Sequence, residues 1–326
     1  MKLLITGALG FVGINIMRTL AARAGVEIVA ADLHPPDRAI RRFLAPLNQA
    51  IRFITLDVTD RAAVRNVITE FGITHIIHGA AATPSPQDEI AKTTQIVDVN
   101  LGGVINVLDA SVASADVARL LVVSSSGVYG LTGQSGMGVL TEESPPALDS
   151  LYAVTKRSAE LLAARYAALH GKRIASVRLG PIYGPGERTS AARPRMSAPG
   201  QLLEARRNDQ PVTVWGADVI RDWTYAGDVG EGLYALLVAE RWQYPVYNLS
   251  YGRPVSFGTM AETFQQQGVE ILWAESAEAA DVRMLPEQTR TPLSTARLLE
   301  DSGYRPQTSP EQGAALSCAL DLKDSG

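Results

Sequence analysis

The sequence predicts an α/β fold, a doubly wound parallel sheet of the Rossmann type, with a smaller, mostly C-terminal α/β substrate lobe. Three observations predict it: apolar runs recur through the first 180 residues, segments with helical spacing separate them, and a loop-rich stretch then breaks the rhythm. Neighbouring parallel strands need long right-handed crossovers, so repeated strand–helix–strand units build a sheet covered on both faces.

Six runs rich in Val, Ile and Leu are the candidate buried strands. They are residues 3–5, 27–31, 52–56, 75–78, 120–123 and 174–177. Between the third and fourth runs, Val64, Val67, Ile68 and Phe71 follow the spacing of one helical face. Thr59 or Asp60 stands where this helix needs an N-cap.

Gly and Pro clusters after Gly180 predict the start of the smaller lobe. We assign residues 1–180 to the first domain, with a segment near 212–250 returning to it, and residues 181–326 to the substrate-binding lobe. The expected helices of the second half are 201–207, 229–239 and 256–266, with a last one near 295–301.

Composition narrows the class of protein. Thirty Lys and Arg against 34 Asp and Glu give a net charge of −4, so no general attraction to nucleic acid or an anionic membrane is expected. The single cysteine excludes an intrachain disulfide and a cysteine-rich zinc site, and we assign no metal ligands. Because no apolar run reaches about 18 residues, we expect a cytoplasmic protein without a membrane partner.

A glycine-rich turn, TGALGFVG at residues 6–13, follows the first strand and precedes a helix. Gly7 allows a tight turn, Gly10 lets backbone amides approach a pyrophosphate, and Gly13 lets the helix pack closely on the strand. The amides of Phe11 and Val12 open that helix. This context favours a dinucleotide site over a merely flexible loop.

The second strand ends at Asp32, whose carboxylate suits the adenosine ribose hydroxyls and repels a 2′-phosphate, so NAD is the expected cofactor. The alternative is an aspartate that begins a surface loop, with His34, Arg38, Arg41 and Arg42 available to a phosphate. Asp57 and Val58, after the third strand, are placed to meet the adenine ring, although helix capping explains Asp57 almost as well.

Tyr152 and Lys156 are four residues apart in a segment with helical character, so they share one face. A nearby ammonium favours a phenolate, which could exchange a proton with a sugar hydroxyl. The alternative is an amphipathic helix with an anchored ring and a solvated lysine. The fifth strand runs into Ser124, Ser125 and Ser126; alternation separates Ser125 from the other two without saying which side faces the cofactor.

Together these residues resemble the extended short-chain dehydrogenase/reductase family of NAD-dependent sugar epimerases, dehydratases and dehydrogenases. The resemblance rests on the glycine turn, Asp32, DV at 57–58, HGAA at 78–81, Asn100, SSSGVYG at 124–130, Tyr152 with Lys156, RLGPIYGPG at 178–186 and RDWTYAGDV at 221–229.

The resemblance implies that Tyr152 is the acid/base, that Lys156 holds the nicotinamide ribose and tunes Tyr152, and that Ser125 is the third catalytic residue. It also implies that Ala80, Ala81 and Asn100 line the cofactor and that Pro181 contacts its nicotinamide side. As substrate contacts we assign Thr83, Ser126, Arg188 and Arg221.

The resemblance leaves the reaction open. Dehydratases of the family carry an Asp-Glu pair where Ser126 and Gly127 stand, so dehydration is disfavoured. Arg221 favours a nucleotide-linked sugar, whereas Pro181 is closer to members that oxidise free sugars or sugar acids. We favour a nucleotide-sugar epimerase; the alternatives are a net dehydrogenase and a non-catalytic NAD-binding sensor. A homodimer through residues 91–113 and 150–169 is expected.

Overall fold

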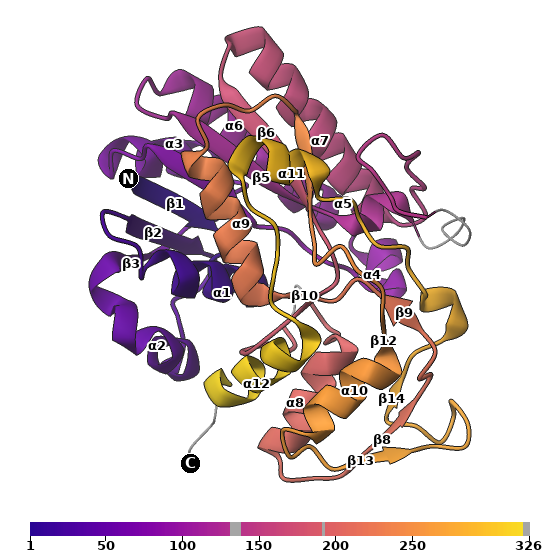
Figure 1. The fold of residues 1–326 in the computed structure, drawn as a ribbon. Coiled ribbons are helices and arrows are strands. Elements are labelled where there is room, and N and C mark those ends of the chain that lie inside the picture. Colours follow the sequence, from indigo (N-terminus) through magenta and orange to yellow (C-terminus); the bar gives the residue numbers. More distant parts are fainter. Residues whose placement is uncertain (131–137, 191–192, 322–326) are drawn as a thin grey trace.

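The computed structural model describes residues 1–130, 138–190 and 193–321, and its largest element is a seven-stranded parallel sheet with helices on both faces (Figure 1). The predicted doubly wound sheet is therefore confirmed. Across the sheet the strands are β11 (Val246–Leu249), β6 (Arg173–Leu179), β5 (Arg119–Ser125), β4 (His75–His78), β1 (Lys2–Thr6), β2 (Glu27–Asp32) and β3 (Ile51–Thr55).

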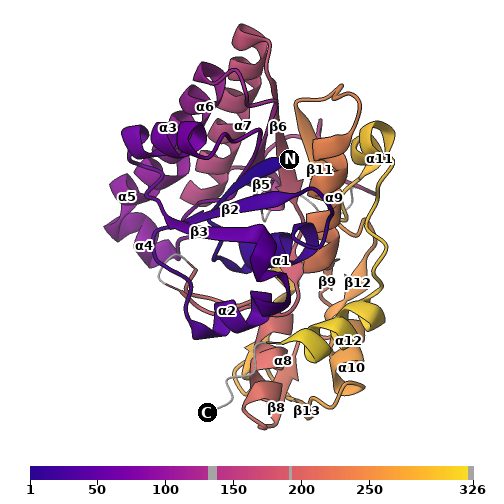
Figure 2. The same ribbon diagram turned by 90° about the vertical axis from the view of Figure 1, so that its left-hand side faces the viewer.

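Two helical layers bury the two faces of this sheet (Figure 2). One layer holds α1 (Phe11–Leu20), α2 (Arg38–Leu44), α9 (Ala226–Val238) and α11 (Ala296–Ser302). The other holds α3 (Arg61–Glu70), α6 (Gly103–Ala113) and α7 (Leu151–His170). The inner positions of these strands are mostly apolar, in agreement with a sheet whose two faces are both covered.

Local sequence explains where the helices begin and end. The predicted helix between β3 and β4 is α3, and of the two candidate caps the structure uses Asp60, whose Oδ1 accepts from Ala63 N at 2.9 Å. Ser150 caps α7 by accepting from Ala153 N, and α7 stops at Gly171, which has the left-handed φ of 61°. The catalytic candidates Tyr152 and Lys156 thus lie in the first turns of a capped helix.

The smaller lobe has its own core and a three-stranded parallel sheet, in the order β13 (Ile271–Trp273), β8 (Val212–Trp215) and β14 (Val282–Arg283). Two short ladders complete its strands: β7 (Ile182–Tyr183) with β10 (Thr224–Tyr225), and β9 (Ile220–Arg221) with β12 (Val255–Ser256). Its helices are α8 (Ala198–Arg207), α10 (Phe257–Gln265) and α12 (Pro310–Leu320).

Two features of the second half differ from expectation. Segment 212–250 was expected to return to the first domain, but only part of it does: β11 pairs in the main sheet and α9 packs against α1, whereas β8 belongs to the sheet of the small lobe. Helix α11, which lies outside that segment, also packs on the first domain, against α9 and β11. The helix near 295–301 is not the last, because α12 follows it. A capping box of Ser309 and Gln312 marks the start of α12, and the spacing of these two residues is a local sequence signal for a helix there.

Between β4 and α6 the chain forms the short helices α4 (Pro86–Ala91) and α5 (Thr93–Val97) and a π-helical turn, η2 (Asp98–Gly102). Residues 93–113 are thus one helical run, which by length and hydropathy alone could cross a membrane. This run packs against α3 and α7, and Asp109 within it pairs with Arg61 and Tyr166. We therefore interpret it as a core helix.

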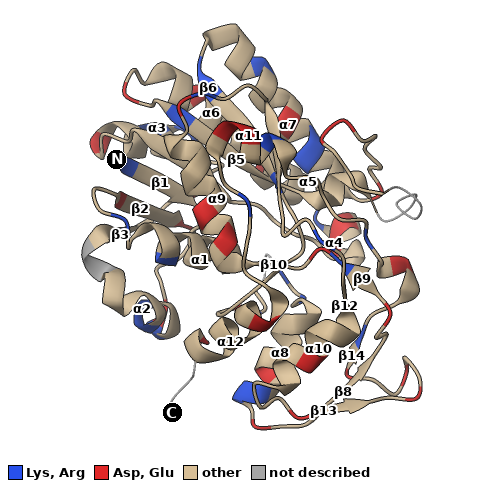
Figure 3. Cartoon of the chain, viewed as in Figure 1, with Lys and Arg blue, Asp and Glu red and all other residues tan. Residues whose placement is uncertain are grey.

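Short 3-10 turns complete the described structure. They are η1 (Ala45–Ala50), η3 (Ser126–Tyr129) and η4 (Pro286–Gln288). Charged side chains of both signs are interspersed over both lobes in the view of Figure 3, in agreement with the small net charge.

Candidate active site

The glycine turn lies where the chain order of the sheet reverses, between the adjacent strands β1 and β4. Gly7 has a φ of +67°, and a Cβ added there would lie 2.7 Å from Ala80 N in the loop after β4. A Cβ at Gly13 would lie 2.4 Å from Gly7 O. Among the described residues no side chain caps α1 at Gly10, so the first amides of this helix are available to an anion.

Asp32 ends β2 beside this turn. Its two carboxylate oxygens accept from Leu9 N at 2.9 Å and from Leu33 N at 2.8 Å. These bonds fix the carboxylate at the carboxyl edge of the sheet, next to the glycine turn, which is where ribose hydroxyls lie in a dinucleotide fold.

Asp57 and Val58 follow β3 at the same edge. Asp57 Oδ1 accepts from both Thr59 N and Thr59 Oγ1, so Asp57 shapes a turn and Asp60 provides the cap. Val58 is buried against Gly103. The capping alternative for Asp57 was wrong, and the adenine contact stays a prediction.

The HGAA segment after β4 is bound to the end of β1 by a polar contact that the sequence did not indicate. Thr6 Oγ1 lies 2.7 Å from His78 Nδ1 and accepts from Ala80 N at 3.3 Å. Burial, and then the nearby Lys156 charge, lower the pKa of His78 to about 3, so this ring is neutral. The pair fixes the backbone that carries Ala80 and Ala81.

Asn100 lies in the π-helical turn η2 and is fully buried. Its Oδ1 accepts from Ala82 N at 2.7 Å, and its Nδ2 donates to Ala82 O and to Thr155 Oγ1. The amide thus ties the loop after β4 to α7. Within the described structure Asn100 acts on the expected cofactor loop through Ala82, and direct contact with the cofactor stays a prediction.

Tyr152 and Lys156 share one face of α7, as predicted. Lys156 Nζ lies 5.6 Å from the centroid of the Tyr152 ring and donates to Val123 O, on β5, at 2.8 Å. Lys156 is buried and Tyr152 is half-buried. The structure therefore does not support the alternative of a solvated lysine.

The structure also decides between the serines after β5. Ser124 points into the core and donates to Glu160 Oε1 at 2.6 Å. Ser125 Oγ accepts from Gly127 N at 3.0 Å. A Cβ at Gly127 would lie 3.3 Å from Ser125 Oγ and 3.6 Å from two atoms of the Tyr152 ring. Ser125 Oγ and the Tyr152 ring therefore lie near the same side of Gly127. Ser126 begins η3 and is half-buried.

Two partly buried arginines meet in the smaller lobe. Arg221 Nε is buried with no hydrogen-bond partner among the described residues, and burial, followed by the charge of Arg290, lowers the pKa of Arg221 to about 10. Burial also lowers the pKa of Arg290, and the negative charge of Asp149 opposes this shift only in part. Asp149 directly precedes Ser150, the N-cap of α7. Sequence reasoning missed Arg290, because no local pattern joins it to Arg221.

The structure also places three other residues for which substrate or nicotinamide contacts were predicted. Arg188 pairs with Asp37, the N-cap of α2, on the surface. Pro181 O accepts from Thr224 N at 2.8 Å, which joins the end of β6 to β10. Thr83 is exposed in the loop after Ala82. Substrate and nicotinamide contacts of these residues stay predictions.

The residues at the carboxyl edge fit NAD. The turn has no room for a side chain at Gly7 or Gly13, the first turn of α1 is uncapped, and Asp32 stands at the end of β2. Together these groups present backbone amides to a diphosphate and a carboxylate to a ribose without a 2′-phosphate.

Fold and site together define an NAD-dependent enzyme of the extended short-chain dehydrogenase/reductase type. The chain belongs to the NAD dependent epimerase/dehydratase family, whose model matches residues 3–250. NAD is accordingly its cofactor.

Named relatives agree with this assignment. The chain is 27% identical to a probable UDP-glucuronate 4-epimerase of Rhizobium meliloti (strain 1021), covering 97% of this chain and 95% of that protein. It is 29% identical to a dTDP-4-dehydro-6-deoxy-D-allose reductase of Streptomyces sp, over 79% and 78%. Its fold matches the NAD complex of the Thermus thermophilus UDP-glucose 4-epimerase with a TM-score of 0.79 at 25% identity, over the full length of both chains.

Replacing Gly13 with alanine is expected to abolish measurable NAD binding. The added methyl would overlap the carbonyl oxygens of Gly7 and Ala8, which lie 2.4 and 2.5 Å from its position, so the turn must open. Calorimetric titration with NAD measures this. Gly102→Ala is the control, because apart from its chain neighbours and its own helix backbone no described atom lies within 4 Å of a Cβ there. Equal NAD affinity in the two variants would contradict the assignment.

Proposed function

We propose that this enzyme is a nucleotide-sugar epimerase. Such an enzyme inverts the configuration at a carbon that bears a secondary hydroxyl, in a sugar linked to a nucleoside diphosphate. The observation that carries this proposal is the pair Arg221 and Arg290: Arg221 Nε is buried without a hydrogen-bond partner among the described residues, and Arg290 N donates to Ile220 O, next to Arg221, at 2.9 Å. Burying two like charges side by side is costly unless an anion pairs with them. A diphosphate offers two charges and a geometry that guanidinium groups match.

The position of this pair relative to α7 supports the proposal. Arg290 interacts with Asp149, three residues before Tyr152, so the arginine pair lies toward the N-terminal end of the catalytic helix. A substrate whose diphosphate is held by these arginines would direct its sugar toward Tyr152. The relatives named as nucleotide-sugar epimerases and reductases support the same substrate class.

In the proposed reaction Tyr152 takes the proton of the sugar hydroxyl and returns a proton to the same oxygen. Ser125, whose Oγ lies near the same side of Gly127 as the Tyr152 ring, hydrogen-bonds that oxygen. The Lys156 ammonium lies 5.6 Å from the centroid of the Tyr152 ring and is held there by its hydrogen bond to Val123 O. NAD, when bound, supplies the acceptor and donor of the hydride.

A substrate panel tests the reaction type. Purified protein with NAD is incubated with UDP-glucuronic acid, UDP-glucose or dTDP-linked hexoses, and in parallel with free uronates and aldoses. The expected result is interconversion of one nucleotide hexose with its epimer and no stoichiometric release of NADH. Stoichiometric NADH formation with a free sugar or sugar acid, without interconversion of any nucleotide hexose, would instead establish a net dehydrogenase.

Replacing Arg221 with methionine is expected to raise the KM for the nucleotide sugar by about ten-fold to a hundred-fold, the usual cost of losing a charge-assisted hydrogen bond. The NAD dissociation constant is expected to stay unchanged, because Arg221 lies in the smaller lobe. Steady-state kinetics and NAD titration measure both quantities. Arg195→Met, at an exposed loop position, is the control; an equal rise in KM there would count against the arginine pair.

A homodimer through residues 91–113 and 150–169 also belongs to the proposal. Large exposed apolar side chains in these segments are Ile105, Val154, Leu161 and Leu169. Leu161→Lys is expected to give monomers in sedimentation velocity, because an unpaired lysine would be buried in the interface. Leu272→Lys, at a similarly exposed leucine in β13, should keep the wild-type state; a monomeric wild type would reject the dimer.

A further inference from the structure

Glu160 extends the catalytic face of α7 by one more turn. Tyr152, Lys156 and Glu160 follow each other at intervals of four residues. Lys156 Nζ donates to Val123 O at 2.8 Å, and Ser124 Oγ donates to Glu160 Oε1 at 2.6 Å. Two consecutive residues of β5 thus bind two consecutive turns of α7, directly before Ser125.

The carboxylate of Glu160 is saturated with donors. Oε1 accepts from Ser124 Oγ and from Arg178 Nε at 2.8 Å; Oε2 accepts from Arg178 Nη2 at 2.7 Å and from Arg157 Nη1 at 2.8 Å. Ser124 and Arg178 are register partners on β5 and β6. One carboxylate therefore joins α7 to two neighbouring strands, with all of its lone-pair positions used.

The same ion pair also holds the far end of the turn that carries Ser125. Arg178 Nη1 donates to the hydroxyl of Tyr129, the last residue of η3, at 2.8 Å. Tyr129 in turn donates to Asn248 Oδ1 on β11 at 2.8 Å. Segment 124–129 is thus anchored at Ser124 by Glu160 and at Tyr129 by Arg178.

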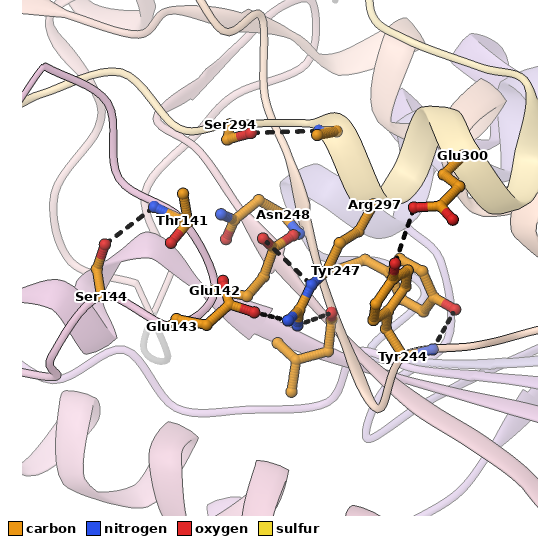
Figure 4. A network of polar contacts seen from close by, with 12 residues as sticks. Thr141, Glu142, Glu143, Ser144, Tyr244, Tyr247, Asn248, Ser294, Arg297 and Glu300 are labelled. Atoms are coloured by element: carbon orange, nitrogen blue, oxygen red, sulfur yellow. Dashed lines mark hydrogen bonds and ion pairs between the residues drawn. The ribbon is translucent and has the colours of Figure 1, made fainter.

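The network continues outward to α11. Asn248 N donates to Glu142 Oε1 at 2.7 Å, and Figure 4 shows Arg297 reaching from α11 to Glu142 and Glu143. Through these contacts the segment before α7 and the strand beside β6 are bound to the same buried cluster. Polar contacts therefore connect the segment that carries Ser125 with the sheet and with α11.

We propose that Glu160 is a positioning residue, which through Ser124 fixes the separation between Ser125 on β5 and Tyr152 on α7. It does not touch the reacting atoms. Because the orientation of catalytic groups controls the rate of the chemical step more than substrate binding, its loss should appear in kcat. This inference rests on the proposed function, in which Tyr152 and Ser125 act on one oxygen.

Ser124→Ala tests the proposal, because it removes the link to β5 while leaving the Glu160–Arg178 pair intact. With UDP-glucuronic acid as probe, we expect kcat to fall about ten-fold or more, while KM and the NAD dissociation constant stay within about two-fold. Ser124→Thr keeps a hydroxyl and should restore most of kcat.

Ser176→Ala on β6 is the matched control: this serine is equally buried, and its hydroxyl has no hydrogen-bond partner among the described residues. It should leave kcat unchanged. Wild-type kcat in a folded Ser124→Ala protein, or an equal fall in Ser176→Ala, would overturn the proposal. A uniform change of kcat, KM and NAD affinity would do the same, because it indicates general loosening. Tyr152→Phe distinguishes failure of this inference from failure of the proposed function, because full activity in that variant rejects the proposed function itself.

Discussion

Tyr152→Phe is expected to lower kcat by about a hundred-fold to ten-thousand-fold, the range usually lost with a general acid/base. The substitution removes only the hydroxyl, and the ring keeps its place beside Gly127 and above Lys156. NAD affinity should change little, since the glycine turn and Asp32 are untouched. Turnover of the substrate found in the panel and calorimetric NAD titration measure the two effects.

Tyr166→Phe is the control for this experiment. It lies on the same helix, and its hydroxyl donates to Asp109 Oδ1 at 2.7 Å, away from Ser125 and Lys156. Its kcat should match that of the wild type. If Tyr152→Phe left every measurable activity unchanged, the chain would instead act as an NAD-binding sensor, the non-catalytic alternative.

Glu160→Met is expected to lower the free energy of unfolding by about 3–5 kcal/mol, because Arg178 would remain buried without its counter-charge. The Glu160 side chain has no exposed area and that of Arg178 is 2% exposed. Urea unfolding followed by circular dichroism measures the loss. Breaking the exposed pair of Arg188 and Asp37 with Asp37→Asn should cost less than about 1 kcal/mol.

A second substitution identifies the cause of this loss. Adding Arg178→Met to Glu160→Met removes the unpaired charge and should recover part of the lost stability, since apolar residues often replace a buried ion pair without net cost. If the double variant were no more stable than Glu160→Met alone, the unpaired arginine would not be the source of the effect.

The same pair predicts a pH dependence. Burial raises the pKa of Glu160, but the hydrogen bonds and the charge of Arg178 outweigh burial and hold it below the ordinary value of 4.5. A carboxyl with a lowered pKa stabilises the fold above its unfolded pKa and loses that contribution as the pH falls. Acid unfolding of the wild type should therefore steepen below pH 4.5, and Glu160→Met should lack this component.

Several parts of the site could be predicted from sequence because they depend on neighbours along the chain. The glycine turn needs residues without a side chain at fixed spacing, and Gly7 and Gly13 have no room for one. Tyr152 and Lys156 share a face because helix geometry places i and i+4 together. Glu160 follows at the same interval, so this residue could have been found in the same way.

Other parts depend on residues brought together across the sheet. Strand alternation separated Ser124 from Ser125, but only the packing of α7 on β5 showed that Ser124 binds Glu160 and that Ser125 Oγ and the Tyr152 ring lie near the same side of Gly127. Arg290 joins Arg221 from nearly 70 residues away along the chain, and no periodicity records that contact.

The sequence by itself determined the alternation of strands and helices in the first 180 residues, the dinucleotide turn and the Tyr152–Lys156 pair, because steric limits and helical periodicity act within a few residues. The tertiary structure alone decided which serine lies beside Tyr152, which arginines meet in the smaller lobe and how Glu160 and Arg178 join α7 to the sheet. These contacts arise from the register of parallel strands and from helix packing, which bring distant residues into a buried environment where unpaired charges are costly.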